Sequence, residues 1–589
     1  MAAAVMAMSA VLGAGQMGAA SGPPPSGAIF PLSEVHKGLH ATAWTVFQGN
    51  KPEPMDVEVL GILRGGRGPG QDMILVQLHG TKPEYTGVVA GMSGSPVYVD
   101  GRLMGALAYR IGQFARDPIA GITPIEQMMA VRDLPLTGSG SQKPTGTDSL
   151  NMKPMETPLT MSGFSVEAIR FWQERMAGTG LETVAAGGAS SAASPAGEAP
   201  EMVPGSAVSA LLVRGDMEIA ATCTVTYIDP RQLLACGHPL FQLGTVELPM
   251  TATEVVATLA SPLNAFKIVN TGAVIGAFTE DRDAAIRGEL GRRARMIPIE
   301  IALRTPESGR RVVKVEILDQ PGLTEQAAMV VLIQALVPAL SNTSVASYHV
   351  KGAIRVAGME AIPLDLWAVP TDAMPAPIAA AIQLGERLGR VHANSTRQTA
   401  VEGIDLEVDA LPRKALTELR GARLLGSNTV HAGDLVEVEA TLQPFQSEAR
   451  KVRLSFRLPA RMTAGTVRLL LSDATTLDRA LGRTQEQAPG PAQGRMSELN
   501  AVAAESRTRH AADRLYLSLL EPGTQATMGG QTLSDLPLSV ANSLEPLRTA
   551  QAASLNGETA ELVAEVEAGE LITGFEVLTL HMEAGAGLN

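Results

Sequence analysis

The sequence predicts a mainly β protein built from short antiparallel strands that close into barrels or pack as sandwiches. Glycine (59 residues) and proline (38) are plentiful, whereas aromatic residues make up only 3% of the chain. Apolar and polar residues alternate over short runs such as MDVEVLGIL and DMILVQLHG, and turn residues separate these runs. With 589 residues, 45% of them hydrophobic, the chain is long enough to bury several cores, which indicates about three or four domains.

The first residues, MAAAVMAMSAVLGAGQMGAASGPPPSG, form an apolar stretch of signal-peptide length followed by a proline-rich spacer. Small residues at 18–20 predict cleavage near Ala20, and hence a secreted, periplasmic or extracellular protein. No lysine or arginine precedes Lys37, which a mis-assigned start codon would explain; a disordered alanine-rich tail is the alternative. No later segment offers the ~18 uninterrupted apolar residues of a membrane span.

The strand-like runs fall into two blocks joined by a linker. The first block ends with a short helix in GITPIEQMMAV, and the linker has two low-complexity runs around a short helix in SVEAIRFWQERMAG. The second block has one good helix, LTEQAAMVVLIQALVPAL, and a helical connector, APIAAAIQLGERLG, follows it. In residues 400–473, apolar and polar residues alternate regularly over short runs separated by turn residues, which predicts a β-sandwich. The predicted boundaries are a signal peptide and spacer (1–28), the first block (29–136), the linker (137–206), the second block (207–370), the connector (371–399), the sandwich (400–473) and a mixed helical and strand region (474–589).

Charge and cysteine usage exclude several function classes. The formal net charge is −13 with no dense Lys/Arg cluster, so we expect no nucleic-acid partner. The two cysteines, Cys223 and Cys236, flank a hairpin whose turn is at Asp229-Pro230, so they form either a disulfide or two buried free thiols. No CxxC or HExxH spacing occurs, so we predict neither a metal site nor a cofactor.

The stretch GMSGSP carries the first candidate for catalysis. A serine hydroxyl becomes a good nucleophile when a base takes its proton and N–H donors stabilise the resulting oxyanion. Gly91 and Gly94 would allow a tight turn in which the N–H groups of Gly91 and Ser93 form an oxyanion hole, with Ser93 as the nucleophile. The alternative is an ordinary Gly/Ser turn between two strands.

His238 is the candidate base among nine histidines. It lies in LLACGHPLFQLG, where Gly237 and Pro239 would hold the ring at a strand end, as expected of a residue presented to a site. The other histidines occupy polar entry segments, a charged helix or ordinary strand and loop positions. A structural role for His238 is the alternative.

These two segments resemble known peptidases. TGVVAGMSGSPVYVDGRLMGALAY, with ITPIEQMM after it, is similar to the nucleophile segment of the SpoIVB-type peptidases, family S55 of the serine peptidases, and its core is similar to the GDSGGP of chymotrypsin-like enzymes. CTVTYIDPRQLLACGHPLF resembles the family's histidine segment. The resemblance covers about residues 29–310 and implies a chymotrypsin-like double β-barrel with Ser93 as nucleophile and His238 as general base. In SpoIVB the histidine segment comes first, so here the halves are expected in circularly permuted order, which the linker would permit.

The third catalytic position departs from the family. The acidic catalytic residue of the S55 family would fall where this chain has Leu78 and His79, neither of which is a carboxylate. Asp72, Asp229 and Asp281 remain candidates to orient the His238 ring, and Asp281 is preferred for its separation from His238. A Ser–His dyad is the alternative.

We therefore predict an exported serine endopeptidase that acts on a protein or peptide substrate. The alternative is a catalytically inactive peptidase fold that serves as a binding or scaffolding protein. The lack of a G-x-S-x-G elbow disfavours an esterase. No PDZ-like segment is evident, and we expect the C-terminal modules to recruit substrate or contact a protein partner.

Overall fold

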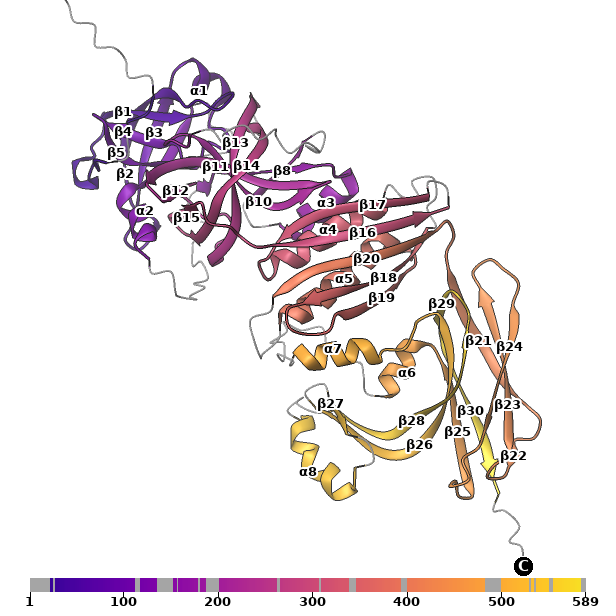
Figure 1. Cartoon of the computed structure of the whole chain (residues 1–589). Helices are drawn as coiled ribbons and strands as arrows, with labels where there is room; N and C mark the ends of the chain where they lie inside the picture. Colours follow the sequence, from indigo (N-terminus) through magenta and orange to yellow (C-terminus); the bar gives the residue numbers. More distant parts are fainter. Residues whose placement is uncertain are drawn as a thin grey trace, which may run out of the picture.

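The structure is a computed structural model, and it shows a chain of β domains in sequence order, from two barrels through a helix-covered sheet to a C-terminal sandwich (Figure 1). No helix in the described part of the chain is long and apolar enough to cross a membrane. The predicted signal peptide lies outside the described residues. The structure describes residues 22–24, 27–111, 117–134, 152–155, 157–177, 181–186, 201–261, 265–306, 309–337, 346–393, 400–481, 499–528, 531–533, 536–549 and 554–583.

The first barrel closes because its fourth strand pairs with both its first and its fifth. Buried residues alternate with more exposed ones along β1 and the first half of β2, so one face of these strands lines the barrel core, whereas β4 is buried on both faces. A 3-10 turn (η1, Leu32–Glu34) precedes the barrel, helix α1 lies between β3 and β4, and helix α2 follows β6. The elements are β1 (His40–Thr45), β2 (Glu53–Gly68), β3 (Gln71–His79), α1 (Thr81–Thr86), β4 (Pro96–Val99), β5 (Arg102–Ile111), β6 (Ile119–Pro124) and α2 (Ile125–Arg132).

A second ring of antiparallel pairings has the same cyclic order as the first: first strand, second, third, sixth, fifth, fourth. Its long β13–β14 hairpin reaches the first barrel, where Ala90 and Phe266 form a parallel bridge. The strands are β10 (Ala207–Gly215), β11 (Glu218–Asp229), β12 (Gln232–Ala235), β13 (Gly244–Leu259), β14 (Phe266–Arg282) and β15 (Ala285–Leu290).

Part of the predicted linker belongs to this second unit. Strand β7 (Met152–Pro154) pairs with β5 of the first barrel, and β8 (Thr157–Ser162) pairs with β11 of the second. Strand β9 (Leu181–Ala186) runs parallel to β8. Helix α3 (Val166–Arg175) begins at Ser165, whose hydroxyl accepts the N–H of Ala168, and it is present as predicted. The linker segment therefore connects the two barrels through strand pairing.

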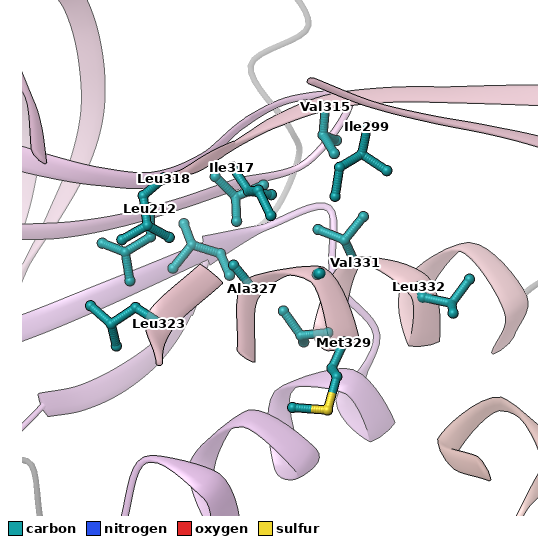
Figure 2. Close-up of a cluster of buried hydrophobic side chains, with 14 of the residues drawn as sticks. Leu212, Ile299, Val315, Ile317, Leu318, Leu323, Ala327, Met329, Val331 and Leu332 are labelled. Atoms are coloured by element: carbon teal, nitrogen blue, oxygen red, sulfur yellow. The ribbon is translucent and has the colours of Figure 1, made fainter. Parts of the chain in front are cut away.

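A helix-covered sheet follows the second ring. Helix α4 (Leu323–Leu336) is buried along nearly its whole length between this sheet and its neighbouring helices. The two predicted helices, α4 and α5 (Ala376–His392), are both confirmed. Figure 2 shows Leu323, Ala327 and Val331 of α4 facing Leu212, Val315 and Ile317 of the strands. The strands are β16 (Met296–Thr305), β17 (Gly309–Leu318), β18 (Ser347–Val356), β19 (Ile362–Ala368) and β20 (Val401–Leu411).

The C-terminal sandwich differs in extent from the predicted one. Strand β20, expected within the sandwich, instead pairs with β16 and β18 of the preceding sheet. The sandwich also includes strands near the C-terminus, because β21–β29 and β25–β30 pairings join segments far apart in the chain. Its elements are β21 (Leu416–Leu425), β22 (Thr429–Val430), β23 (Leu435–Pro444), β24 (Arg450–Arg457), β25 (Gly465–Ser472), α6 (Ala474–Ala480), α7 (Leu499–Thr508), β26 (Arg514–Met528), β27 (Gln531–Leu533), α8 (Leu538–Thr549), β28 (Ser554–Glu567), β29 (Leu571–Thr573) and β30 (Phe575–Met582).

Candidate active site

Ser93 lies in a tight turn between α1 and β4 of the first barrel. Gly91 and Gly94 both have φ of +94°, a conformation that glycine adopts without the steric cost a side chain brings. The N–H of Met92 donates to Val89 O, and that of Ser95 donates to Met92 O. The glycines therefore make the turn that the sequence predicted.

Strand β11 of the second ring holds this turn from the other side. The Thr224 hydroxyl donates to Gly91 O (2.9 Å), and the Thr224 N–H donates to Ser93 O (2.8 Å). The Thr226 hydroxyl donates to Gly94 O (2.7 Å). Because side chains alternate along a strand, both threonines face the turn. The two barrels thus fix the carbonyl groups on either side of Ser93.

The two serines of the turn differ in their hydrogen bonding. The Ser95 hydroxyl donates to Met92 O at 2.6 Å, so it serves the turn itself. The Ser93 hydroxyl is buried and has no hydrogen-bond partner among the described residues. Within the same described part, no acceptor is found for the backbone N–H groups of Gly91 and Ser93, whereas those of Ala90, Met92 and Gly94 are all bonded. A free hydroxyl and two free N–H donors therefore occupy one turn.

His238 lies in the corresponding turn of the second ring, between its third and fourth strands, β12 and β13. Cys236 and Gly237 have φ of +67° and +72° and turn the chain sharply after β12. Gly237 packs on β5: a Cβ placed on it would lie 3.0 Å from the Cβ of Ala108. The Thr123 hydroxyl donates to Gly237 O at 2.7 Å. The histidine turn is thus docked on the first barrel.

The His238 ring is held in one tautomer. Its Nδ1 lies 2.8 Å from Pro239 O, and because a carbonyl only accepts, Nδ1 carries the hydrogen. Nε2 is then an acceptor, and it is buried and has no partner in the described residues. Burial lowers the pKa of His238 to about 4, and the nearby Arg67 contributes in the same direction. The ring is therefore neutral at neutral pH, as a general base must be.

The serine and histidine turns are in direct contact. A Cβ on Gly94 would lie 1.9 Å from Thr224 O and 2.6 Å from Cys236 N, so only a glycine fits against this part of the second ring. Gly94 N–H also donates to Leu107 O, beside which Gly237 packs. A disulfide joins Cys223 to Cys236 (S–S 2.05 Å), which settles the two alternatives left by the sequence. The turns that carry Ser93 and His238 therefore contact each other, although the two side chains are not hydrogen-bonded to each other.

The three candidate carboxylates do not contact the His238 ring. The Asp281 carboxylate accepts the N–H groups of Leu240 and Phe241, both at 2.8 Å, so it holds the chain that follows His238. Asp72 accepts from Arg64 and from the N–H of Gly65, in the β2–β3 hairpin. Asp229 lies at the β11–β12 turn, at the end of the hairpin remote from His238. The Pro239 carbonyl occupies the position at Nδ1 that a catalytic aspartate would take.

Two buried basic side chains near the site were not singled out from the sequence. Arg67 of β2 donates to the Asp283 carboxylate at 2.9 Å, which links the first barrel to the β14–β15 turn of the second ring. Lys267 of β14 is fully buried beside Gly91. A lysine in the otherwise apolar run AFKIV was the available signal for it. No cluster of residues able to hold a metal ion is found in the described ranges.

Comparison with known proteins identifies the segment around Ser93. Residues 26–129 match the family model described as SpoIVB peptidase S55, which is a family of serine peptidases. The matched range contains Ser93, Gly91 and the whole first barrel, and it ends before His238. No match was found among curated proteins or among solved structures.

Proposed function

We propose that this protein is a serine endopeptidase in which Ser93 is the nucleophile and His238 the general base. One observation carries the proposal: the interlocked turns of two barrels present a free serine hydroxyl, a free imidazole Nε2 and two free N–H donors. The match of residues 26–129 to a serine peptidase family supports the reaction class. The substrate is a protein or peptide.

The chemistry follows from these groups. Ser93 Oγ attacks the carbonyl carbon of the scissile bond while its proton passes to His238 Nε2. The N–H groups of Gly91 and Ser93 stabilise the oxyanion, a contribution worth about 10²–10³ in rate per donor in related sites. The intermediate collapses as His238 returns the proton to the leaving amine nitrogen. Water, deprotonated by the same Nε2, then hydrolyses the acyl-enzyme.

The proposed architecture is a permuted chymotrypsin-like double barrel. Both rings share one cyclic strand order, and Ser93 and His238 each lie between the third and fourth strand of their ring. This equivalence supports a permutation in which one barrel supplies the serine and the other the histidine, since geometry and not chain order defines such a site. The strand pairings made by β7 and β8 would keep the permuted halves together.

A Ser–His dyad is the form of site we propose, with the Pro239 carbonyl fixing the tautomer. A neutral carbonyl stabilises the imidazolium less than a carboxylate does, so turnover is expected to be slow. Ser93 and His238 are 0% and 2% exposed, so a substrate reaches them only after the surrounding loops move. That enclosure is the observation that favours the alternative, an inactive scaffold.

A fluorophosphonate probe separates the two functions. An active site should become labelled at neutral pH, and labelling should be lost in Ser93→Ala. Ser95→Ala is the matched control, because its hydroxyl serves only the turn, and it should keep labelling. Wild-type protein that stays unlabelled under native conditions would favour the scaffold.

We also propose that the protein is exported. A buried disulfide that ties the histidine turn to β11 persists in an oxidising compartment and is rare in the cytosol. Detection of the processed protein outside the cytoplasm, with an N-terminus near residue 21, would test this. An unprocessed cytoplasmic protein would contradict it.

A further inference from the structure

We propose that Lys267 is a positioning residue of the nucleophile turn, whose uncharged amine and aliphatic stem hold Gly91 in place and whose protonation releases it. This inference rests on the proposed function of Ser93. Lys267 lies outside both the serine and the histidine segments, and it acts through Gly91, whose N–H is one of the two proposed oxyanion donors.

The backbone of Lys267 is joined directly to the turn. Its N–H donates to Ala90 O (3.2 Å), and the Ala90 N–H donates to Ala265 O (2.8 Å). The side chain then runs along Gly91: a Cβ on that glycine would lie 3.2 Å from Lys267 Cδ and 3.5 Å from its Cβ. Movement of this side chain therefore displaces Gly91.

Among the residues that the structure describes, the amine has one hydrogen-bond partner, and that partner is neutral. Lys267 Nζ lies 2.7 Å from the Thr45 hydroxyl at the end of β1, and both residues are fully buried. The side chain lies beside Gly91, which Pro158 of β8 also approaches, and Thr258 is opposite Lys267 in the β13–β14 hairpin. None of them titrates, and no carboxylate among the described residues pairs with the amine.

A buried ammonium without a counter-ion is unstable, so burial favours the uncharged amine. Burial lowers the pKa of Lys267 to about 7, well above the value of about 4 for His238. Below pH 7 the charged amine must move toward water or recruit an anion, and either movement shifts Gly91. Lys267, and not His238, should then set the acid limit of activity.

Three proteins test this: the wild type, Lys267→Met, which keeps the stem without the amine, and Lys267→Arg, which is permanently charged. Lys82→Met is the control, because its amine lies at the surface of the first barrel. The rate of fluorophosphonate labelling in the wild type should fall about tenfold from pH 8 to pH 6. In Lys267→Met this fall should disappear, and Lys267→Arg should label about tenfold more slowly at both pH values.

Hydrogen exchange provides a readout that does not need activity. Peptides covering residues 87–98, corrected for intrinsic rates, should lose protection below pH 7 in the wild type but not in Lys267→Met. Equal pH profiles of protection in these two proteins would overturn the role of Lys267, whether or not the protein labels. Normal pH-dependent protection without any labelling would instead refute the peptidase function alone.

Discussion

Replacement of Gly94 by alanine should separate the two barrels at the candidate active site. Gly94 has φ of +94°, and a Cβ there would lie 1.9 Å from Thr224 O and 2.6 Å from Cys236 N. Gly101, in the β4–β5 turn, has φ of +78° but nothing within 4 Å of its Cβ position. Gly101→Ala is therefore a matched control that has the backbone strain without the overlap.

The loss of stability in Gly94→Ala has two contributions, the backbone strain at positive φ and the overlap of the new methyl group with its neighbours. A residue other than glycine at positive φ costs about 1–2 kcal/mol at either position. Overpacking costs about 1–3 kcal/mol in general. The upper part of that range, about 2–3 kcal/mol, applies here because the overlapped atoms belong to the backbone of the second ring and cannot rotate away. We expect a loss of about 3–5 kcal/mol for Gly94→Ala, against about 1–2 kcal/mol for Gly101→Ala.

Hydrogen exchange measured by mass spectrometry on peptides of β11 and β12 reports this difference. Thr224 lies in β11 and Cys236 directly follows β12, and the new methyl group would displace the Cys236 N–H from Thr224 O, to which it donates. An extra 2–3 kcal/mol corresponds to exchange that is about 30- to 150-fold faster in Gly94→Ala than in the control. Equal exchange rates in the two variants would refute the close contact between the serine turn and the second ring.

Three further predictions concern residues around His238. Asp281→Asn should slow fluorophosphonate labelling at least about tenfold, because the Leu240 and Phe241 N–H groups bond to different carboxylate oxygens and one of these becomes an NH2 donor in asparagine. Asp229→Asn should stay within about twofold, and similar rates in the two variants would refute this role of Asp281. Replacing both Cys223 and Cys236 by serine removes the disulfide and should reduce fluorophosphonate labelling under conditions where circular dichroism still shows a folded protein. Unchanged labelling of this double variant would contradict a role of the disulfide in holding the histidine turn. The pKa of Lys267 is about 7 in the folded protein and 10.5 in the unfolded chain, so between these pH values the unfolded state binds more protons than the folded state. The free energy of unfolding should therefore rise as the pH rises from about 7 to about 10.5, by up to about 4–5 kcal/mol. Lys267→Met should lack this rise when the free energy of unfolding is measured with urea.

The sequence predicted correctly those features that depend on residues close to one another along the chain. The alternation in MDVEVLGIL gave a barrel strand. The turn at Asp229-Pro230 folds β11 and β12 into a hairpin that brings Cys223 and Cys236 close enough to form their disulfide. The glycines of GMSGSP have the positive φ that a tight turn requires. In each case the interacting residues are close in sequence, so periodicity and turn chemistry determine the outcome.

The features that the sequence did not predict depend on contacts between residues far apart in the chain. Strand β20 alternates like a sandwich strand, but its partner β16 lies about a hundred residues earlier and pairs with it in parallel, which periodicity does not encode. Asp281 was preferred for its spacing, yet its carboxylate bonds to the backbone after His238. The burial of Lys267 depends on Thr45 of the other barrel. Such contacts follow from how the two barrels dock and not from local patterns.

The rate of phosphonylation at Ser93, with the modified residue mapped by mass spectrometry, tests the central claim most directly. We expect the adduct on Ser93 in the wild type and a rate about 10²–10⁴-fold lower in His238→Ala, because the base that takes the serine proton is gone. His79→Ala, which alters a partly exposed histidine of the first barrel, should react like the wild type. An adduct on Ser95, or an equal rate in His238→Ala, would contradict a Ser93–His238 site.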